Sequence, residues 1–219
     1  MFDADKIIAA LQRELPKGLN AIKTEGGAMI DRVKTDEQSK NTAMGAAAAG
    51  AIGALLLSGV MGKFGRKVAT IGGVAALGNL AYQAYKKHAN TADEQKFLPS
   101  GEQKEALGKL TLKAIINAMK ADGIIDETEK AKLYESLKDA DLSDEEKAFL
   151  FDEMAKPIDT MGLVAAISDK ETAIEIYAAS FVAINPNGQA EANYLNDLAA
   201  KLNISPELAQ SVREEALAN

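Results

Sequence analysis

The feature that most constrains this chain is a run of twenty uncharged residues, Ala43 to Gly62, with the sequence AMGAAAAGAIGALLLSGVMG. A short basic break, Lys63 to Lys67, separates it from a second uncharged run, Val68 to Tyr85. As helices, the two runs would reach roughly 30 and 27 Å, about the thickness of the hydrocarbon core of a bilayer. The pair predicts a helical membrane hairpin over residues 43–87, with membrane lipid as its partner.

Small side chains recur at four-residue spacing in both runs, the pattern called a glycine zipper. In lipid, such faces let helix backbones approach closely and gain packing energy. We expect the hairpin arms to pack on each other, or on copies in a homo-oligomer, through Gly45, Ala49, Gly50, Gly53, Gly72 and Gly73. Because Ala and Gly are only weakly apolar on membrane-insertion scales, a buried hairpin in a soluble assembly is the alternative.

Charge divides the chain into two differently built parts. Residues 1–100 hold 13 Lys and Arg against 9 Asp and Glu, a net charge of +4, whereas residues 101–219 hold 12 against 23, a net charge of −11. An acidic half repels phosphate, and no basic stripe with interleaved aromatics occurs, so we expect no nucleic-acid partner. A cation or a basic protein is a more suitable partner for this acidic half than a nucleic acid. The absence of cysteine excludes disulfides, thiolate metal sites and cysteine nucleophiles.

Two further segments flank the predicted hairpin. Residues 1–42 place apolar side chains at helical spacing, which predicts two short amphipathic helices on a membrane surface or on a partner. A partly disordered leader is the alternative, because short isolated helices are marginally stable. Residues 88–101 are polar and end in Pro99-Ser100-Gly101, the composition of a linker.

Residues 102–219 predict an all-α domain. Apolar residues recur there at helical spacing with no alternating strand pattern, which indicates about seven helices around one core. Four helix starts are marked by capping residues: Asp126, Ser143, Ser168 and Ser205. Three methionines at helical spacing are expected in the core: Met119, Met154 and Met161.

The lone histidine, His88, is expected near the membrane interface, and it cannot by itself form a histidine zinc site.

The most specific motif is Ala121-Asp122-Gly123-Ile124-Ile125-Asp126-Glu127-Thr128-Glu129. Gly123 can end one helix and Asp126 can begin the next, which predicts a tight helix-turn-helix. A weaker echo follows, where Phe181 and Glu191 stand ten residues apart, as do Met119 and Glu129.

This motif, in an acidic all-helical domain, resembles the tellurite-resistance TerB fold. A Gly/Ala-rich hairpin before such a domain resembles the YebE-type bacterial inner-membrane proteins. The resemblance implies a TerB-like domain anchored in the inner membrane, without established catalytic activity, in which a divalent cation is held by Asp122, Asp126, Glu129 and Glu191. Asn185 and Asn187 stand where related second turns often carry Asp, which weakens such a site. Helix capping and a solvated acidic face explain the same residues without a metal.

These observations predict that the protein has a non-catalytic function. We expect a membrane-anchored module that docks an unknown protein partner or senses ions; the resemblance adds a role in envelope or metal stress. We expect no catalytic residue and no cofactor besides that possible divalent cation. The alternatives are a membrane-remodelling oligomer assembled through the hairpins and a divalent-metal-binding domain. The expected location is the bacterial inner membrane, with the C-terminal domain in the cytoplasm.

Overall fold

The computed structural model describes residues 2–11, 13, 73–89, 93–98, 100–121, 134–135, 137–138, 140–184 and 189–218. All regular elements in these ranges are helical, and no strand occurs among them, as the all-α prediction requires. Residues 4–11 are helical, and the later elements are α3 (Gly73–Lys86), η1 (Glu94–Phe97), α4 (Glu102–Ala121), α6 (Asp144–Ala155), α7 (Thr160–Ala165), α8 (Lys170–Ala183), α9 (Gln189–Lys201) and α10 (Pro206–Ala218).

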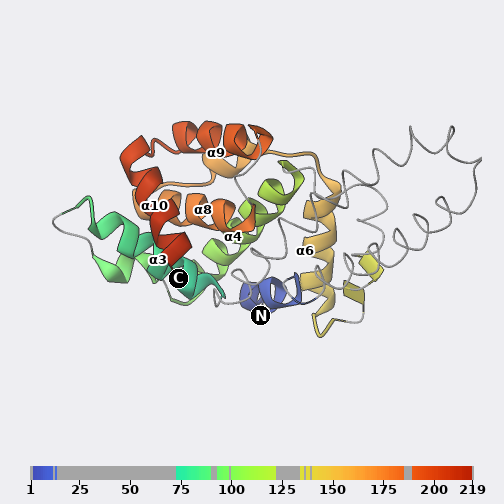
Figure 1. The fold of residues 1–219 in the computed structure, drawn as a ribbon. Helices are drawn as coiled ribbons and strands as arrows, with labels where there is room; N and C mark the ends of the chain where they lie inside the picture. Colours follow the sequence, from blue (N-terminus) through green and yellow to red (C-terminus); the bar gives the residue numbers. More distant parts are fainter. Residues whose placement is uncertain are drawn as a thin grey trace, which may run out of the picture.

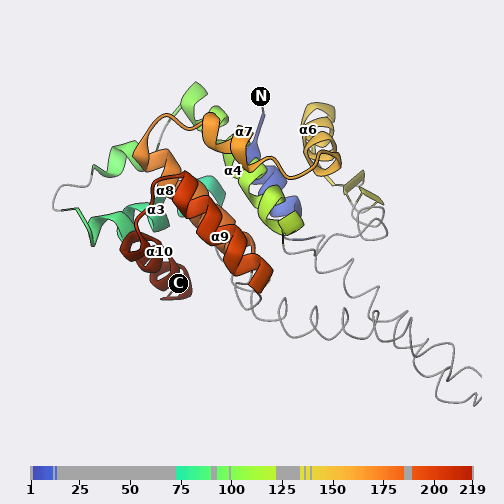
Figure 2. The same ribbon diagram turned by 90° about the horizontal axis from the view of Figure 1, so that it is seen from above.

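Helices α4 and α8 form the centre of the fold (Figure 1). Their contact is the most extensive between any two described elements, and α3 packs across both α8 and α10. Every residue of α8 from Ala173 to Val182 is buried. A helix that is apolar on all sides is stable only when it is covered all round. Figure 2 shows how α3, α9 and α10 surround it, with α6 set apart at the far side of α4.

The buried residues form two clusters. The C-terminal cluster draws on α3, η1, α4 and α7 to α10, and its largest fully buried side chains include Phe97, Tyr177 and Phe181. The N-terminal cluster joins residues from the start of the chain to α3, α4 and α6: Phe2, Ile7, Ile8, Leu11, Val74, Leu107, Leu112, Ile116, Leu137, Leu142, Leu150 and Met154. Helix α4 contributes to both clusters, so it ties them into one fold.

Helix α3 corrects the expected hairpin. Its residues belong to the second uncharged run, which was predicted as the second membrane arm, yet α3 lies in the protein core. Its apolar side chains pack against α8 and α10. An uncharged amphipathic helix gains as much by burial in protein as by burial in lipid, because both remove apolar surface from water. Residues 73–87 therefore pack with the helical domain, in contrast to the predicted separate hairpin.

The first uncharged run, residues 43–62, lies outside the described residues. So do five of the six small residues expected in helix packing: Gly45, Ala49, Gly50, Gly53 and Gly72. Among the described helices, none has both the length and the apolar character needed to span a bilayer.

The start of the chain also differs from expectation. Its amphipathic helix packs on α4 and α6 rather than on a membrane or a separate partner. Ile7 and Leu11, whose spacing predicted an apolar face, are 0% and 3% exposed in the N-terminal cluster. The ring of Phe2 meets that of Phe149 edge to face at 5.0 Å between centroids. The prediction of an apolar helical face is confirmed for these residues, and its partner is the domain itself.

The expected linker contains an anchor. Phe97 is 1% exposed. Its ring lies 5.8 Å from that of Tyr82 and 5.9 Å from that of Tyr85, centroid to centroid. Phe97 thus holds η1 against α3, so this described part of the predicted linker packs on the domain. The composition of residues 88–101 did not predict this anchor, because one aromatic side chain among polar residues leaves the segment polar on average.

Several helix starts follow the predicted chemistry. Ser143 and Glu146 form a complete capping box at α6, and Ser205 accepts a hydrogen bond from Leu208 N ahead of Pro206. At α8 the cap is Asp169, one residue later than the predicted Ser168. Met119 and Met154 are buried, but Met161 is 65% exposed, so its assignment to the core was wrong. Helix α7 is only six residues long and turns Met161 to solvent.

Glu175 is a buried acid at the crossing of α3 and α8. It is 3% exposed, and its Oε1 atom has no hydrogen-bond partner among the described residues. A Cβ on Gly78 would lie 2.4 Å from that oxygen and 2.2 Å from the carbonyl oxygen of Phe97. The missing side chain at Gly78 therefore lets Glu175 and η1 approach α3. Burial raises the pKa of Glu175 to about 8, with a smaller contribution from the charge of Asp169.

We predict that Glu175 makes stability depend on pH. Its ordinary pKa is 4.5 and its folded pKa is about 8. The folded state holds the proton more tightly, so the contribution of Glu175 to stability is fully present below pH 4.5 and is lost as pH rises to about 8. The full effect is at most about 5 kcal/mol. Urea unfolding followed by circular dichroism from pH 5 to 9 should show this fall, and Glu175→Gln should flatten it.

The matched control is Glu94→Gln, a change at an exposed acid on η1. It should leave the pH profile of unfolding as in the wild type. A wild-type profile that is flat from pH 5 to 8 would contradict the assignment of a buried, protonated Glu175.

Candidate functional site

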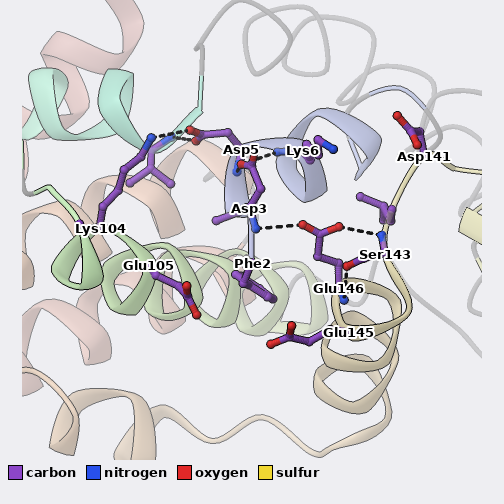
Figure 3. A pocket seen from close by; sticks show the side chains of 14 residues that line it. Phe2, Asp3, Asp5, Lys6, Lys104, Glu105, Asp141, Ser143, Glu145 and Glu146 are labelled. Carbon is purple, nitrogen blue, oxygen red and sulfur yellow. Dashed lines mark hydrogen bonds and ion pairs between the residues drawn. The ribbon is translucent and has the colours of Figure 1, made fainter.

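Among the described residues, an acidic groove of 590 Å³ lies at the junction of the chain start, α3, α4 and α6 (Figure 3). Six acids and two lysines are among its lining side chains: Asp3, Asp5, Glu105, Asp141, Glu145, Glu146, Lys6 and Lys104. The excess of carboxylates gives the groove a negative potential, which attracts cations and basic side chains. We call this site the acidic groove.

Asp5 closes one end of the acidic groove. Its Oδ1 accepts a hydrogen bond of 2.7 Å from the backbone N of Val74, and its Oδ2 lies 3.4 Å from Nζ of Lys104. The first N–H groups of a helix lack partners within the helix, and a carboxylate there also interacts favourably with the helix dipole. Asp5 therefore caps α3 from 69 residues away and links the chain start to α3 and α4.

Gly73 makes this approach possible. Its φ is +62°, a conformation that side chains disfavour, and a Cβ there would lie 2.4 Å from Oδ1 of Asp5. Gly73 was predicted to pack one hairpin helix on another. The structure instead uses its lack of a side chain to admit the carboxylate of Asp5 at the start of α3.

Glu146 holds the other end of the acidic groove. Its Oε1 accepts 2.9 Å from Asp3 N and its Oε2 accepts 2.8 Å from Ser143 N, while it is 3% exposed. Burial alone would raise the pKa of Glu146, but the hydrogen bonds from Ser143 and Asp3 outweigh it, and the pKa lies below its ordinary value. Glu146 thus stays ionised and fastens the chain start to α6.

Two further acids of the acidic groove are accessible to a binding partner. Asp141 and Glu145 are exposed at the rim, and neither is joined by a hydrogen bond or ion pair to another described residue. Glu105 is engaged with Nζ of Lys109 at 2.8 Å. Figure 3 shows Glu105 and Glu145 projecting from α4 and α6 on either side of Phe2. These positions can accept hydrogen bonds from a cationic group.

The predicted metal ligands are only partly covered by the structure. Asp122, Asp126 and Glu129 lie outside the described residues, as do Asn185 and Asn187. Glu191 stands in the first turn of α9, where a carboxylate suits the helix dipole. Within the described part of the chain, no group of three or more His, Asp or Glu side chains is placed to hold a metal ion.

His88 contacts protein rather than a membrane interface. Its Nε2 lies 2.7 Å from Oγ of Ser211 on α10, and the neighbouring Lys87 forms an ion pair of 2.8 Å with Glu215. The hydrogen bond with Glu215 raises the pKa of Lys87. Neither residue lines the acidic groove. His88 and Lys87 together fasten the end of α3 to α10. The sequence did not predict this contact, because His88 and Ser211 are 123 residues apart in the chain.

The fold and the acidic groove define a small all-α protein whose groove is built from capping carboxylates. The model of a family described as "Protein of unknown function (DUF533)" matches residues 41–216, so the chain belongs to that family. Neither a curated protein nor a solved structure matches the chain.

We predict that Asp5→Ala loosens the start of α3. The change removes the acceptor for Val74 N and the partner of Lys104, and loss of such a cap costs about 1–2 kcal/mol. Hydrogen exchange should show faster exchange at Val74 than in the wild type, and urea unfolding should give a lower midpoint. Asp141→Ala, at an exposed acid of the same groove, is the control and should change neither. Unaltered exchange at Val74 in Asp5→Ala would contradict the clamp.

Proposed function

We propose that this protein is a non-catalytic interaction module associated with the bacterial inner membrane. In this proposal the uncharged run 43–62 contacts lipid, and the helical domain recognises a cationic partner through the acidic groove. The observation that carries the proposal is where the run sits in the chain. Leu11 precedes the run and Val74 follows it, and both belong to the N-terminal cluster, so chain segments before and after the run are parts of one domain.

The acidic groove supports recognition in preference to catalysis. Its Asp5 and Glu146 carboxylates already accept hydrogen bonds from backbone N–H groups, which holds them in fixed positions. The exposed carboxylates beside them can pair with the lysines or arginines of another protein. Complementary charge of this kind mainly sets the rate and specificity of association.

The likeness of the motif at 121–129 to TerB domains, and of the Gly/Ala-rich run to YebE-type proteins, supports the same proposal. On the basis of these two resemblances we propose a role in envelope or metal stress. The small residues Gly45, Ala49 and Gly53 would allow copies to contact one another in lipid.

We predict that a charge within the run abolishes membrane association. Wild-type protein expressed in a bacterium should remain in the membrane pellet after carbonate extraction. Leu56→Glu should move to the supernatant, because a charged side chain in the hydrocarbon core costs about 3 kcal/mol. Leu56→Ala is the control and should stay in the pellet, and circular dichroism should show equal helix content in all three. Extraction of the wild type by carbonate would refute the membrane part of the proposal.

We predict that reversing the charge of two residues at the rim of the acidic groove weakens the binding of the partner. Chemical crosslinking in cells, followed by mass spectrometry, should join the wild type to a basic protein through residues near the acidic groove. The double change Asp141→Lys and Glu145→Lys should reduce that crosslink at least tenfold, since like charges then face each other. Reversal of Glu94 to Lys on η1 leaves the groove intact and serves as the control. Equal crosslinking in both variants would exclude the groove as the binding surface.

A further inference from the structure

We propose that a proton on Glu175 keeps η1 docked on α3 and α8, and that loss of this proton releases η1 from a domain that otherwise stays folded. The proposal is independent of the acidic groove and of membrane association. It rests on the way in which α3, α8 and η1 meet at Gly78.

Two oxygen atoms converge on Gly78 without a hydrogen-bond donor between them. A Cβ at this position would lie 2.4 Å from Oε1 of Glu175 and 2.2 Å from the carbonyl oxygen of Phe97, so the two oxygens face each other across the bare backbone of α3. Oε1 is buried and has no hydrogen-bond partner among the described residues. Two facing acceptors repel each other, whereas a protonated carboxyl group offers an O–H donor. The geometry therefore requires a proton on Glu175 while η1 is docked.

The lysines of α3 and η1 are engaged with groups other than Glu175. The single charged residue of α3 is Lys86, at the end of the helix, and its Nζ lies 5.6 Å from the centre of the Tyr82 ring. On η1, Lys96 forms an ion pair of 3.3 Å with Glu171. Neither element therefore supplies a cation to an ionised Glu175.

The helices themselves offer no compensation either. On α8, Nζ of Lys170 lies 4.8 Å from the centre of the Tyr85 ring. Burial and, to a smaller extent, the charge of Asp169 raise the pKa of Glu175 to about 8, so the proton is lost just above neutral pH. Charged residues of the helices that pack on α8 form pairs with other residues: Lys104 with Asp5, Lys109 with Glu105, Lys113 with Glu153, Lys201 with Asp197, and Glu215 with Lys87.

The element that can yield to this charge is η1. It has four residues, Glu94–Phe97, whereas α3 and α8 each contact several other helices along their length. A short 3-10 helix has few hydrogen bonds of its own, and their geometry is poor. When η1 moves away, the ionised carboxylate regains hydration, and segments with few buried contacts open at the lowest free energy. Ionisation of Glu175 should therefore undock η1 before the helices separate.

Hydrogen exchange of the full chain, followed by mass spectrometry at pH 6 and pH 9, tests this proposal. The amides of Lys96 and Leu98 donate to the carbonyl oxygens of Asp93 and Gln95 and report whether η1 is formed. After correction for the intrinsic exchange rate, we expect their protection to fall about tenfold or more between pH 6 and pH 9. The amides of α8 should keep their protection over the same range.

Two variants separate the role of Glu175 from other effects of pH. Glu175→Gln should keep η1 protected at pH 9, because the side-chain amide is neutral and offers an N–H donor to the Phe97 carbonyl. Glu94→Gln changes an exposed acid on η1 itself and should lose protection as the wild type does. In infrared spectra, the band of a protonated carboxyl group should be present in the wild type at pH 6, vanish at pH 9 and be missing from Glu175→Gln.

Three results would overturn the proposal. The first is equal protection of η1 at both pH values in the wild type. The second is loss of that protection at pH 9 in Glu175→Gln, because a group other than Glu175 would then respond to pH. The third is a parallel loss of protection in η1 and α8, since the whole domain would then open together.

Discussion

The hydrogen bond from Val74 N to the carboxylate of Asp5 fixes the chain start against the first turn of α3. It joins the chain start to α3 across 69 residues, and Glu146 repeats the device by accepting from Asp3 N. Both contacts use the same chemistry, a carboxylate placed where backbone N–H groups lack partners. The acidic groove results from these contacts, because the carboxylates that accept hydrogen bonds from the backbone N–H groups of α3 and of the chain start also line the space between them.

Helix α3 is held in the core by contacts along its whole length. Asp5 caps its first turn, Gly78 lies against Glu175 and η1, and the ring of Phe97 packs at a tilt against Tyr82 and Tyr85. At its end, His88 meets Ser211 on α10. Within this series, the contact of Glu175 with α3 depends on pH in the neutral range, because burial raises its pKa to about 8. Ionisation there would place an uncompensated charge against α3 and weaken its packing on α8.

The all-α class and most core positions could be predicted from the sequence, because helical spacing of apolar residues and local capping both act over a few residues. The capping box of Ser143 and Glu146 is such a case. The acidic groove could not be predicted, since Asp5, Val74 and Glu146 come together only through tertiary packing. Met161 shows the converse: its spacing resembles that of a core residue, but the short helix α7 leaves it exposed.

The second uncharged run shows why the absence of charge alone does not distinguish a core helix from a membrane helix. Both runs lack charge, yet residues 73–85 carry large apolar side chains on one face and polar Asn79 and Gln83 elsewhere. Residues 43–62 contain no Asn, Gln or charged residue, so every face of a helix formed there would be free of strongly polar groups. The place of α3 in the core follows from the contacts of its apolar face with α8 and α10, which the absence of charge alone did not reveal.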